Sequence, residues 1–595
     1  MAGFNYITAS LREEIKTWEE HEWRQNMEKV ISIGNQGFED IRKNDNFYVD
    51  KTDFIKEWWE SRDTVTLITR PRRFGKTLNM DMLKCFFSNQ YAGRSELFEG
   101  LSIWNEEKYR NLQGQYPVIF VSFATIKADN YVDARDGIIS AVYRAYQEHY
   151  SLFQKSEIEE SEKKFFKELD IYVNTITPDK KMTNETVFRA LNSLAACLFR
   201  YYGKKAIILL DEYDTPMQEA YINGYWEEFT GFMRSMFNAT FKTNPYMERA
   251  VMTGITRVSK ESLFSDLNNL RVVTLTSEAY STCFGFTEKE VFAALDSYGM
   301  SGEKEKVKKW YDGFVFGSVK DIYNPWSITG FLKEKRYQTY WVATSSNGMV
   351  SNLIQKASSE VKTKMEELLQ EQEIVESFDE QIVFNQLDVN ESAIWSLLMA
   401  SGYLKAVEVE YRGELMKPWY HLKITNFETK CMFETLFAAW FRNATASYNK
   451  FIKAMMENDL EVMNYYMNRV TQETFSYFDV GSGKTGLEET ERFYHGFVLG
   501  LMAEQAENYV LKSNRESGFG RYDVMMIPKK EKLPAVIMEF KVHREKEKDL
   551  EETLHIARQQ IEEKNYDAEL LAQGIPKERI RHYGFAFEGK NVLIG

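Results

Sequence analysis

The pattern of apolar and polar positions divides the chain into regions with different periods. From residue 31 to 280, short continuous apolar runs alternate with stretches of helical period. This alternation is typical of an α/β domain with a buried parallel sheet. We expect five strands there, at Val65–Thr69, Val118–Phe123, Ala206–Leu210, Ala250–Ile255 and Val272–Leu275. Residues 1–30 are charged and amphipathic, and they predict a helical arm.

The rest of the pattern predicts a helical middle region and a second α/β domain. Residues 281–475 are mainly helical and aromatic. Within them, residues 391–425 contain a helix and then two β-prone runs around Arg412-Gly413, which predicts a winged-helix-like element. Such an element can dock on DNA or act as a structural spacer, and we favour the spacer because a fold does not fix a function. Residues 476–595 predict a separate α/β domain.

The composition excludes several classes of protein. The 595 residues exceed what one core accommodates, and 44% hydrophobic content excludes wholesale disorder. The net charge of −14 excludes a chain that coats nucleic acid non-specifically, so any such contact requires local basic patches. Four cysteines lie far apart without a CxxC pair, which predicts reduced thiols rather than a disulfide framework or a zinc site. No signal-peptide pattern or bilayer-length apolar run occurs, so we expect a cytoplasmic protein without a membrane partner.

The run Val65–Thr69 leads into the segment RPRRFGKT, Arg70–Thr77, and an apolar-periodic helix follows. A strand, a loop ending in Gly-Lys-Thr and a helix form the context of a phosphate-binding P-loop. Arg70 stands where the usual pattern begins with glycine, so we expect arginine side chains near the phosphates of a bound nucleoside triphosphate. The loop residues expected to contact the nucleotide are Arg70, Arg72, Arg73, Phe74, Gly75, Lys76 and Thr77.

The strand Ala206–Leu210 ends in Asp211-Glu212, which is a Walker B arrangement. We expect Asp211 to hold Mg²⁺ together with Thr77, and Glu212 to orient or deprotonate the attacking water. Arg257 follows the next expected strand and could stabilise transferred charge, although an ordinary surface arginine would look the same. A second Gly-Lys-Thr, within Gly481–Thr485, has no apolar strand before it and predicts a loop.

Two β-prone runs at residues 520–528 and 534–542 flank a charged turn and predict a β-hairpin. The symmetric prolines beside the turn place Asp523 opposite Glu539, and the two-residue strand period puts Lys541 on the face of Glu539. Two carboxylates suit Mg²⁺, and a lysine can orient or activate a water for attack on phosphorus. A salt-bridged hairpin face without catalysis is the alternative.

The segments RPRRFGKT, LLDEYD, TGITR, WYDGFVFG and YNPWSI resemble the AAA-ATPase-like family of prokaryotic proteins, whose members commonly carry a C-terminal PD-(D/E)xK nuclease-like domain. The resemblance implies a P-loop NTPase fold with a parallel sheet flanked by helices, and a C-terminal α/β domain of the restriction-endonuclease kind. The Asp523…Glu539-x-Lys541 arrangement resembles that nuclease core. The segment ARQQIEEKNY resembles the family's Gln-Ile helix and makes Gln560 a candidate helper, with helix packing as the alternative. Glu491 and His495 lie four residues apart on one face of an expected helix, and they too are either helpers of the nuclease site or residues of helix packing and surface.

These observations favour an ATP-binding protein, with hydrolysis expected, coupled to a Mg²⁺-dependent nuclease domain that acts on DNA in preference to RNA. The alternative is a nucleotide-dependent switch or scaffold with a nuclease-like domain that does not cleave. ATP and Mg²⁺ are the expected cofactors, and a homo-oligomer is left open. The aromatic segments WYDGFVFG and YNPWSI carry no chemistry of their own, and we expect them to pack against a neighbouring domain.

Overall fold

The computed structural model describes most of the chain after the expected N-terminal arm. The described residues are 29–595 without 176–181, 257–262, 265, 345–349, 352, 355–356, 370, 381–386, 388–389, 443–444, 475–501, 503–507, 518–519, 532, 545 and 590. The expected sites at Arg257, Glu491 and His495, and the segment Gly481–Thr485, therefore lie outside the described residues.

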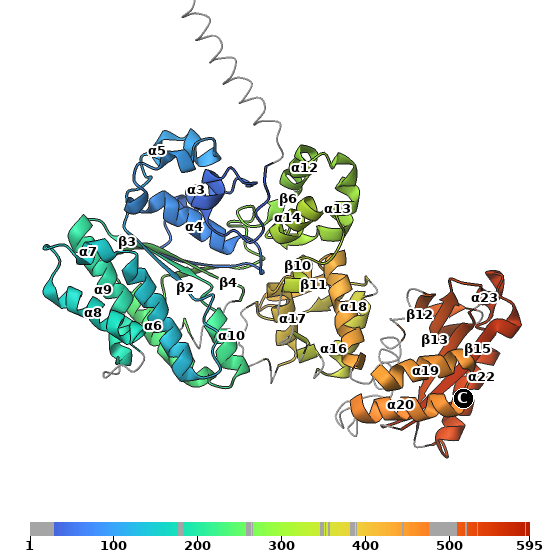
Figure 1. Ribbon diagram of the computed structural model, residues 1–595. Coiled ribbons are helices and arrows are strands. Elements are labelled where there is room, and N and C mark those ends of the chain that lie inside the picture. Colours follow the sequence, from blue (N-terminus) through green and yellow to red (C-terminus); the bar gives the residue numbers. More distant parts are fainter. Residues whose placement is uncertain are drawn as a thin grey trace, which may run out of the picture.

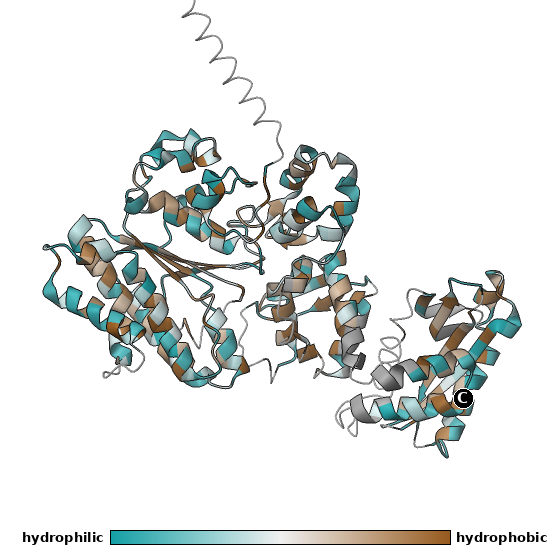
Figure 2. Ribbon diagram, viewed as in Figure 1, coloured by the Kyte–Doolittle hydropathy of each residue, from teal (hydrophilic) through white to brown (hydrophobic). Residues whose placement is uncertain are grey.

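A five-stranded parallel sheet with the order β2-β3-β4-β1-β5 forms the first unit. Its strands are mainly brown in Figure 2, as expected for apolar runs that are largely buried on both faces. All five strands lie at the positions predicted from the sequence, with small differences at their ends. They are β1 (Val65–Thr69), β2 (Val118–Ser122), β3 (Ala206–Asp211), β4 (Met247–Gly254) and β5 (Leu270–Val273).

Helices cover both faces of this sheet, with α3 and α4 on one side and α6 and α9 on the other (Figure 1). The helices are α2 (Phe38–Lys43), α3 (Asp53–Ser61), α4 (Lys76–Phe87), α5 (Glu107–Arg110), α6 (Tyr131–Gln147), α7 (Tyr150–Phe153), α8 (Glu160–Asn174), α9 (Asn184–Tyr202), α10 (Thr215–Ile222) and α11 (Trp226–Phe241). Because the strands are parallel, the loops after β1, β3 and β4 meet at one edge of the sheet.

The middle region contains two small antiparallel sheets. The first has the order β6-β8-β7, and the second has the order β10-β11-β9. A helix followed by the β10–β11 hairpin occurs where the sequence predicted a winged-helix-like element, and β9 adds a third strand. The elements are β6 (Phe286–Thr287), α12 (Glu288–Ser297), α13 (Lys304–Tyr311), β7 (Phe314–Phe316), β8 (Val319–Tyr323), α14 (Pro325–Glu334), α16 (Ser359–Leu369), β9 (Ile374–Glu376), α17 (Ser392–Ala400), β10 (Leu404–Arg412), β11 (Lys417–Ile424) and α18 (Phe427–Arg442).

The middle region shares a hydrophobic core with the first unit. Phe74 of the loop after β1 packs on Phe314 and Phe316, with ring centroids 4.7 and 5.3 Å apart. Trp341 and Tyr403 continue the same cluster of buried side chains. The aromatic WYDGFVFG segment thus packs against the neighbouring unit, as the sequence predicted.

A mixed sheet with the order β12-β13-β14-β15-β16 forms the C-terminal unit, in which only the β14–β15 pair is parallel. Helices α19 and α20 contribute Phe451, Met455 and Met463 to its core, so this unit takes in helices that the sequence had assigned to the middle region. The elements are α19 (Thr445–Glu457), α20 (Leu460–Thr474), β12 (Tyr509–Ser517), β13 (Gly520–Pro528), β14 (Ala535–Val542), α22 (Leu550–Glu563), α23 (Ala568–Ala572), β15 (Ile580–Glu588) and β16 (Asn591–Ile594).

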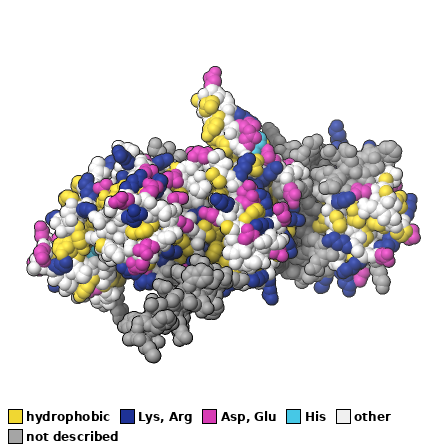
Figure 3. All heavy atoms as spheres, turned by 90° about the horizontal axis from the view of Figure 1, so that it is seen from above, with side chains coloured by type: hydrophobic (Ala, Val, Ile, Leu, Met, Phe, Trp, Pro, Cys, Tyr) yellow, Lys and Arg dark blue, Asp and Glu magenta, His cyan; other side chains and the backbone are white. Residues whose placement is uncertain are grey.

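Side chains of both charges are interspersed over the face drawn in Figure 3. Among the described helices, none combines the length and the apolar character needed to cross a bilayer.

Candidate functional site

The loop between β1 and α4 has the backbone of an anion-binding turn. Arg73 and Gly75 take left-handed conformations, with φ of 67° and 78°. Glycine adopts this conformation without strain at the residue that caps α4, where backbone N–H groups are open to a ligand. Lys76 is buried, and its Nζ donates to the carbonyl oxygens of Arg70 (2.9 Å) and Pro71 (2.8 Å). Burial lowers the pKa of Lys76, while Glu212 and the nearby aspartates oppose that shift.

The ends of β3 and β4 meet the start of α4 through the carboxylate of Asp211. Its Oδ2 accepts a hydrogen bond from Thr77 Oγ1 at 2.8 Å, and its Oδ1 accepts one from Thr253 Oγ1 at 2.6 Å. The carboxylate is fully buried, and this burial raises the pKa of Asp211. Glu212 has φ of 52°, which turns the chain sharply after β3 and places its side chain at the cavity beside the loop. The structure thus brings together Lys76, Thr77, Asp211 and Glu212.

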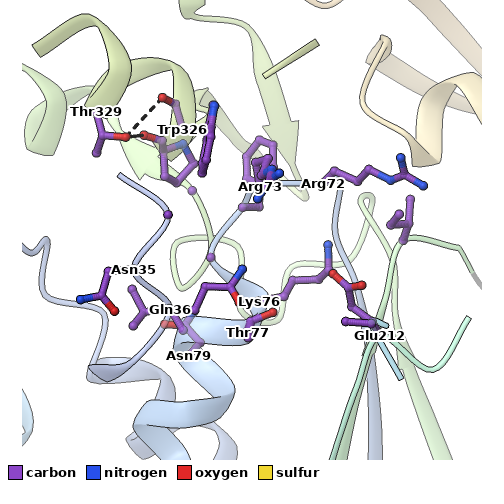
Figure 4. A pocket seen from close by; sticks show the side chains of 18 of the residues that line it. Asn35, Gln36, Arg72, Arg73, Lys76, Thr77, Asn79, Glu212, Trp326 and Thr329 are labelled. Atoms are coloured by element: carbon purple, nitrogen blue, oxygen red, sulfur yellow. Dashed lines mark hydrogen bonds between the residues drawn. The ribbon is translucent and has the colours of Figure 1, made fainter. Parts of the chain in front are cut away.

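A cavity of about 880 Å³ opens over this loop. It extends from Glu212 past the loop to residues 31–36 and to Trp326 on α14 (Figure 4). Tyr48 and Lys51, which precede β1, also line it. A volume of this size, lined by charged and polar groups and by aromatic side chains, suits a small-molecule ligand with a charged and an apolar part.

Arg70 occupies a different place from the one that the sequence predicted. Its side chain is fully buried and is absent from the cavity wall, because its guanidinium is directed into the protein. Nη1 donates to the carbonyl oxygens of Thr69 (2.9 Å) and Thr274 (2.8 Å), and the group lies 4.7 Å from the ring centroid of Phe316. Burial lowers the pKa of Arg70 to about 10. The geometry makes Arg70 an anchor of the loop rather than a phosphate contact.

The YNPWSI segment holds the loop from the other side. Asn324 caps α14 and donates from Nδ2 to the carbonyl oxygen of Arg72 at 3.2 Å. The guanidinium carbon of Arg73 lies 4.2 Å from the ring centroid of Trp326. This segment therefore contacts the P-loop directly, and the sequence reasoning gave it no such position.

Asp214 is a buried residue of this site that the sequence reasoning did not single out. Its Oδ2 accepts hydrogen bonds from the backbone N–H groups of Ile255 and Thr256, both at 2.9 Å. Burial raises the pKa of Asp214. A Cβ on Gly254 would lie 2.8 Å from Asp214 Oδ1, so glycine is needed for this close approach. Asp214 is the last residue of the LLDEYD segment, and this second acidic residue close to Asp211 is the sequence feature that could have identified it.

The β13–β14 hairpin has the register that the sequence predicted. Val524 pairs with Met538 and Met526 with Val536, so the next pair outward is Asp523 and Glu539. Asp523 Oδ2 accepts a hydrogen bond from the backbone N–H of Phe540 at 2.8 Å, next to Glu539.

Glu539 is 1% exposed and is the centre of a polar cluster on this sheet. Its Oε1 accepts hydrogen bonds from Lys541 Nζ at 3.0 Å and from Nε2 of Gln560 on α22. Gln560 also donates to the hydroxyl of Tyr566 at 3.2 Å. Burial raises the pKa of Tyr566, and the charges of Glu539 and Asp523 add to the rise. The sequence reasoning missed Tyr566, although it ends the ARQQIEEKNY segment.

Comparison with known proteins supports both halves of this description. Residues 32–264 match the family described as predicted AAA-ATPase, and residues 489–595 match the PD-(D/E)XK nuclease superfamily. A protein of Azotobacter chroococcum mcd 1, named as an uncharacterized protein in the vnfD 5′ region, is 24% identical over 404 residues, which is 68% of this chain and 68% of that protein. The chain therefore carries a predicted AAA-ATPase domain over residues 32–264 and a domain of the PD-(D/E)XK nuclease superfamily over residues 489–595.

Proposed function

We propose that the protein binds and hydrolyses ATP with Mg²⁺ at the loop after β1, and that it cleaves nucleic acid at the β13–β14 hairpin. The observation that carries the ATP half is the hydrogen bond from Thr77, which lines the cavity, to Asp211 at the end of β3. It joins the P-loop to the end of β3 in the arrangement that a nucleotide-bound magnesium ion requires.

The chain's own groups account for binding. The first backbone N–H groups of α4 and the side chain of Lys76 lie at the part of the cavity lined by Thr77 and Glu212, where phosphates would lie. The oxygens of Thr77 and Asp211 are hard ligands that fit Mg²⁺, which would neutralise phosphate charge when bound. Glu212 lines the same space, within reach of a water that attacks the terminal phosphate.

The nuclease half rests on Asp523, Glu539 and Lys541. The two carboxylates fit a divalent cation, which would polarise the phosphodiester when bound. Lys541, fixed by Glu539, would hold a water for attack on phosphorus, and Gln560 would fix the orientation of Glu539. DNA is the preferred substrate in this proposal.

Titration of the purified protein with ATP and Mg²⁺, and of Lys76→Ala, tests the first half. We expect at least tenfold weaker binding in the variant, since a charged hydrogen-bond donor to phosphate is lost. Lys163→Ala, on the surface helix α8, is the matched control. Equal affinity of Lys76→Ala and the control would refute the ATP site.

Cleavage of DNA and RNA with Mg²⁺ or Mn²⁺, by wild type and Asp523→Asn, tests the second half. We expect the variant to lose the metal-dependent activity. The alternative, a nucleotide-dependent switch or scaffold that does not cleave, is favoured by the deep burial and ion pairing of Glu539. ATP binding without cleavage of either nucleic acid by the wild type would support that alternative.

A further inference from the structure

The consecutive arginines Arg72 and Arg73 point to opposite walls of the cavity (Figure 4). Arg73 stacks on Trp326 of α14, at 4.2 Å. Arg72 extends the other way, toward α10 and the side on which Glu212 lies, and its Nη2 donates to Gln218 Oε1 at 3.4 Å. Among the described residues, Arg72 and Arg73 are the arginines that line the cavity. Because the two side chains point in opposite directions, they would contact different parts of a bound ligand.

Gln218 links Arg72 to Asp214, which lies just after β3. Its Oε1 faces the guanidinium, and its Nε2 donates to Asp214 Oδ2 at 3.4 Å. Turning the amide over would set its NH₂ group against the guanidinium and its oxygen against the carboxylate, so the two partners fix its orientation. Asp214 in turn accepts from the backbone N–H groups of Ile255 and Thr256. The position of Arg72 is thus tied to the residues that follow β4, the strand that carries the Asp211 partner Thr253.

The main chain of Arg72 is fixed as well, since its carbonyl oxygen accepts the hydrogen bond from Asn324 at 3.2 Å. The guanidinium of Arg72 adds to burial in lowering the pKa of Lys76. Two cations held on one wall repel each other, and the carboxylates of Glu212, Asp214 and Asp211 oppose the effect of that repulsion on Lys76. The terminal phosphate of a nucleotide bound at the P-loop would be a further anion shared by both cations.

We propose that Arg72 contacts the γ-phosphoryl group of bound ATP and stabilises its charge during hydrolysis, and that Gln218 is the positioning residue for this arginine. In the reaction, a water oxygen forms a bond to the γ-phosphorus and the bond from that phosphorus to the β–γ bridging oxygen breaks. The water proton passes to the Glu212 carboxylate, and ADP and inorganic phosphate leave. Arg72 balances the negative charge that develops on the γ-oxygens and the bridging oxygen. This inference rests on the proposed ATP site.

The proposal assigns separate roles to the arginines of one loop. Arg70 anchors the loop from inside, Arg73 holds it to α14, and Arg72, which contacts Gln218 on the cavity wall, would contact the nucleotide. The arginine that stabilises transferred charge would then come from the same chain as the P-loop lysine. A second subunit would not be needed to supply it.

Calorimetric titration with ATP and with ADP, beside steady-state ATP hydrolysis, tests the proposal on the full chain. In Arg72→Ala we expect ATP binding to weaken roughly ten- to hundredfold while ADP binding changes less than about threefold, because a charged contact to the γ-phosphate alone is lost. We expect kcat to fall by about 10³ or more. Arg72→Lys keeps the charge but not the fork, and we expect an intermediate loss. Gln218→Ala should lower kcat about tenfold with KM nearly unchanged, since it loosens the arginine without removing it.

Arg189→Ala is the control, because Arg189 is exposed on α9 and pairs with Glu185. Equal ATP-to-ADP affinity ratios in wild type and Arg72→Ala would overturn the inference and leave the proposed ATP site intact. An Arg72→Lys protein that loses ADP and ATP binding alike would also overturn it, since the loop would then need Arg72 for its shape. A wild type that binds no ATP at all would refute the proposed function together with this inference.

Discussion

Glu428 provides a quantitative test of how the middle region is held together. It lies in the first turn of α18 and is fully buried. Its carboxylate accepts hydrogen bonds from Ser327 Oγ on α14 at 2.7 Å and from the backbone N–H of Trp341 at 2.9 Å. These donors are neutral, and burial raises the pKa of Glu428 from 4.5 to about 7. A carboxylate in this position joins α14, which contacts the P-loop, to α18.

The rise in pKa fixes the sign and size of a pH effect on stability. Between the two pKa values, the folded protein keeps a proton on Glu428 that the unfolded chain has released, so stability falls as pH rises. The stabilisation is complete below about pH 4.5 and is lost as pH rises through about 7. At about 1.4 kcal/mol per pKa unit, the effect is about 3 kcal/mol.

We therefore expect Glu428→Gln to flatten the dependence of unfolding on pH between about pH 5 and about pH 8. The amide keeps an acceptor for the backbone N–H groups and can donate to the hydroxyl of Ser327. At the upper end of this range, the variant should be more stable than the wild type by up to about 3 kcal/mol.

Thermal unfolding followed by tryptophan fluorescence suits the measurement, because Trp341 lies against Glu428. For a unit of this size, we expect roughly 2–4 °C per kcal/mol. Glu185→Gln, whose carboxylate is 72% exposed, is the control and should parallel the wild type. Parallel curves for wild type and Glu428→Gln across the range would refute the reasoning.

Three further predictions concern the two domains. Gly254→Ala should destabilise the first unit by about 1–3 kcal/mol in a thermal scan, because the new Cβ would lie 2.7 Å from Tyr213 Cε1, whereas Gly231→Ala, with open space around it, should gain up to about 1 kcal/mol. Arg70→Lys should lower the melting temperature even without nucleotide, since carbonyl groups that the guanidinium satisfies lose their donors, and an unchanged melting temperature would contradict the anchoring role. Lys541→Met should abolish nucleic-acid cleavage while Mn²⁺ still binds in calorimetry, and loss of metal binding would instead make Lys541 a support of the carboxylates.

The contacts of the P-loop join it to the helices of the middle region. Trp326 of α14 stacks on Arg73, and Ser327, the next residue, donates to Glu428 of α18. A shift of the loop on nucleotide binding would therefore act on α14 first, and on α18 through a buried hydrogen bond. The Glu428→Gln variant removes the ionisable group from that connection without touching either site, which makes it useful beyond its pH dependence.

Part of the candidate sites could be predicted because it depends on neighbouring residues only. The P-loop lies between one strand and one helix, and Asp211 ends an apolar strand, so parallel pairing brings Thr77 and Asp211 to the same edge. The β13–β14 register could be predicted because a short symmetric turn fixes it. The position of Arg70 could not, since its donors meet the carbonyl of Thr274, which lies far along the chain.

The sequence by itself determined the parallel sheet, the P-loop with its Walker B partner and the register of the β13–β14 hairpin. It did so because strand period, loop chemistry and turn symmetry are local properties of the chain. Only the tertiary structure decided which way each loop arginine points. A side-chain period shows that a face is buried, but the element that covers it is set by packing between distant segments. In this protein those segments carry Trp326, Gln218 and Phe316, each beside a different arginine of one loop.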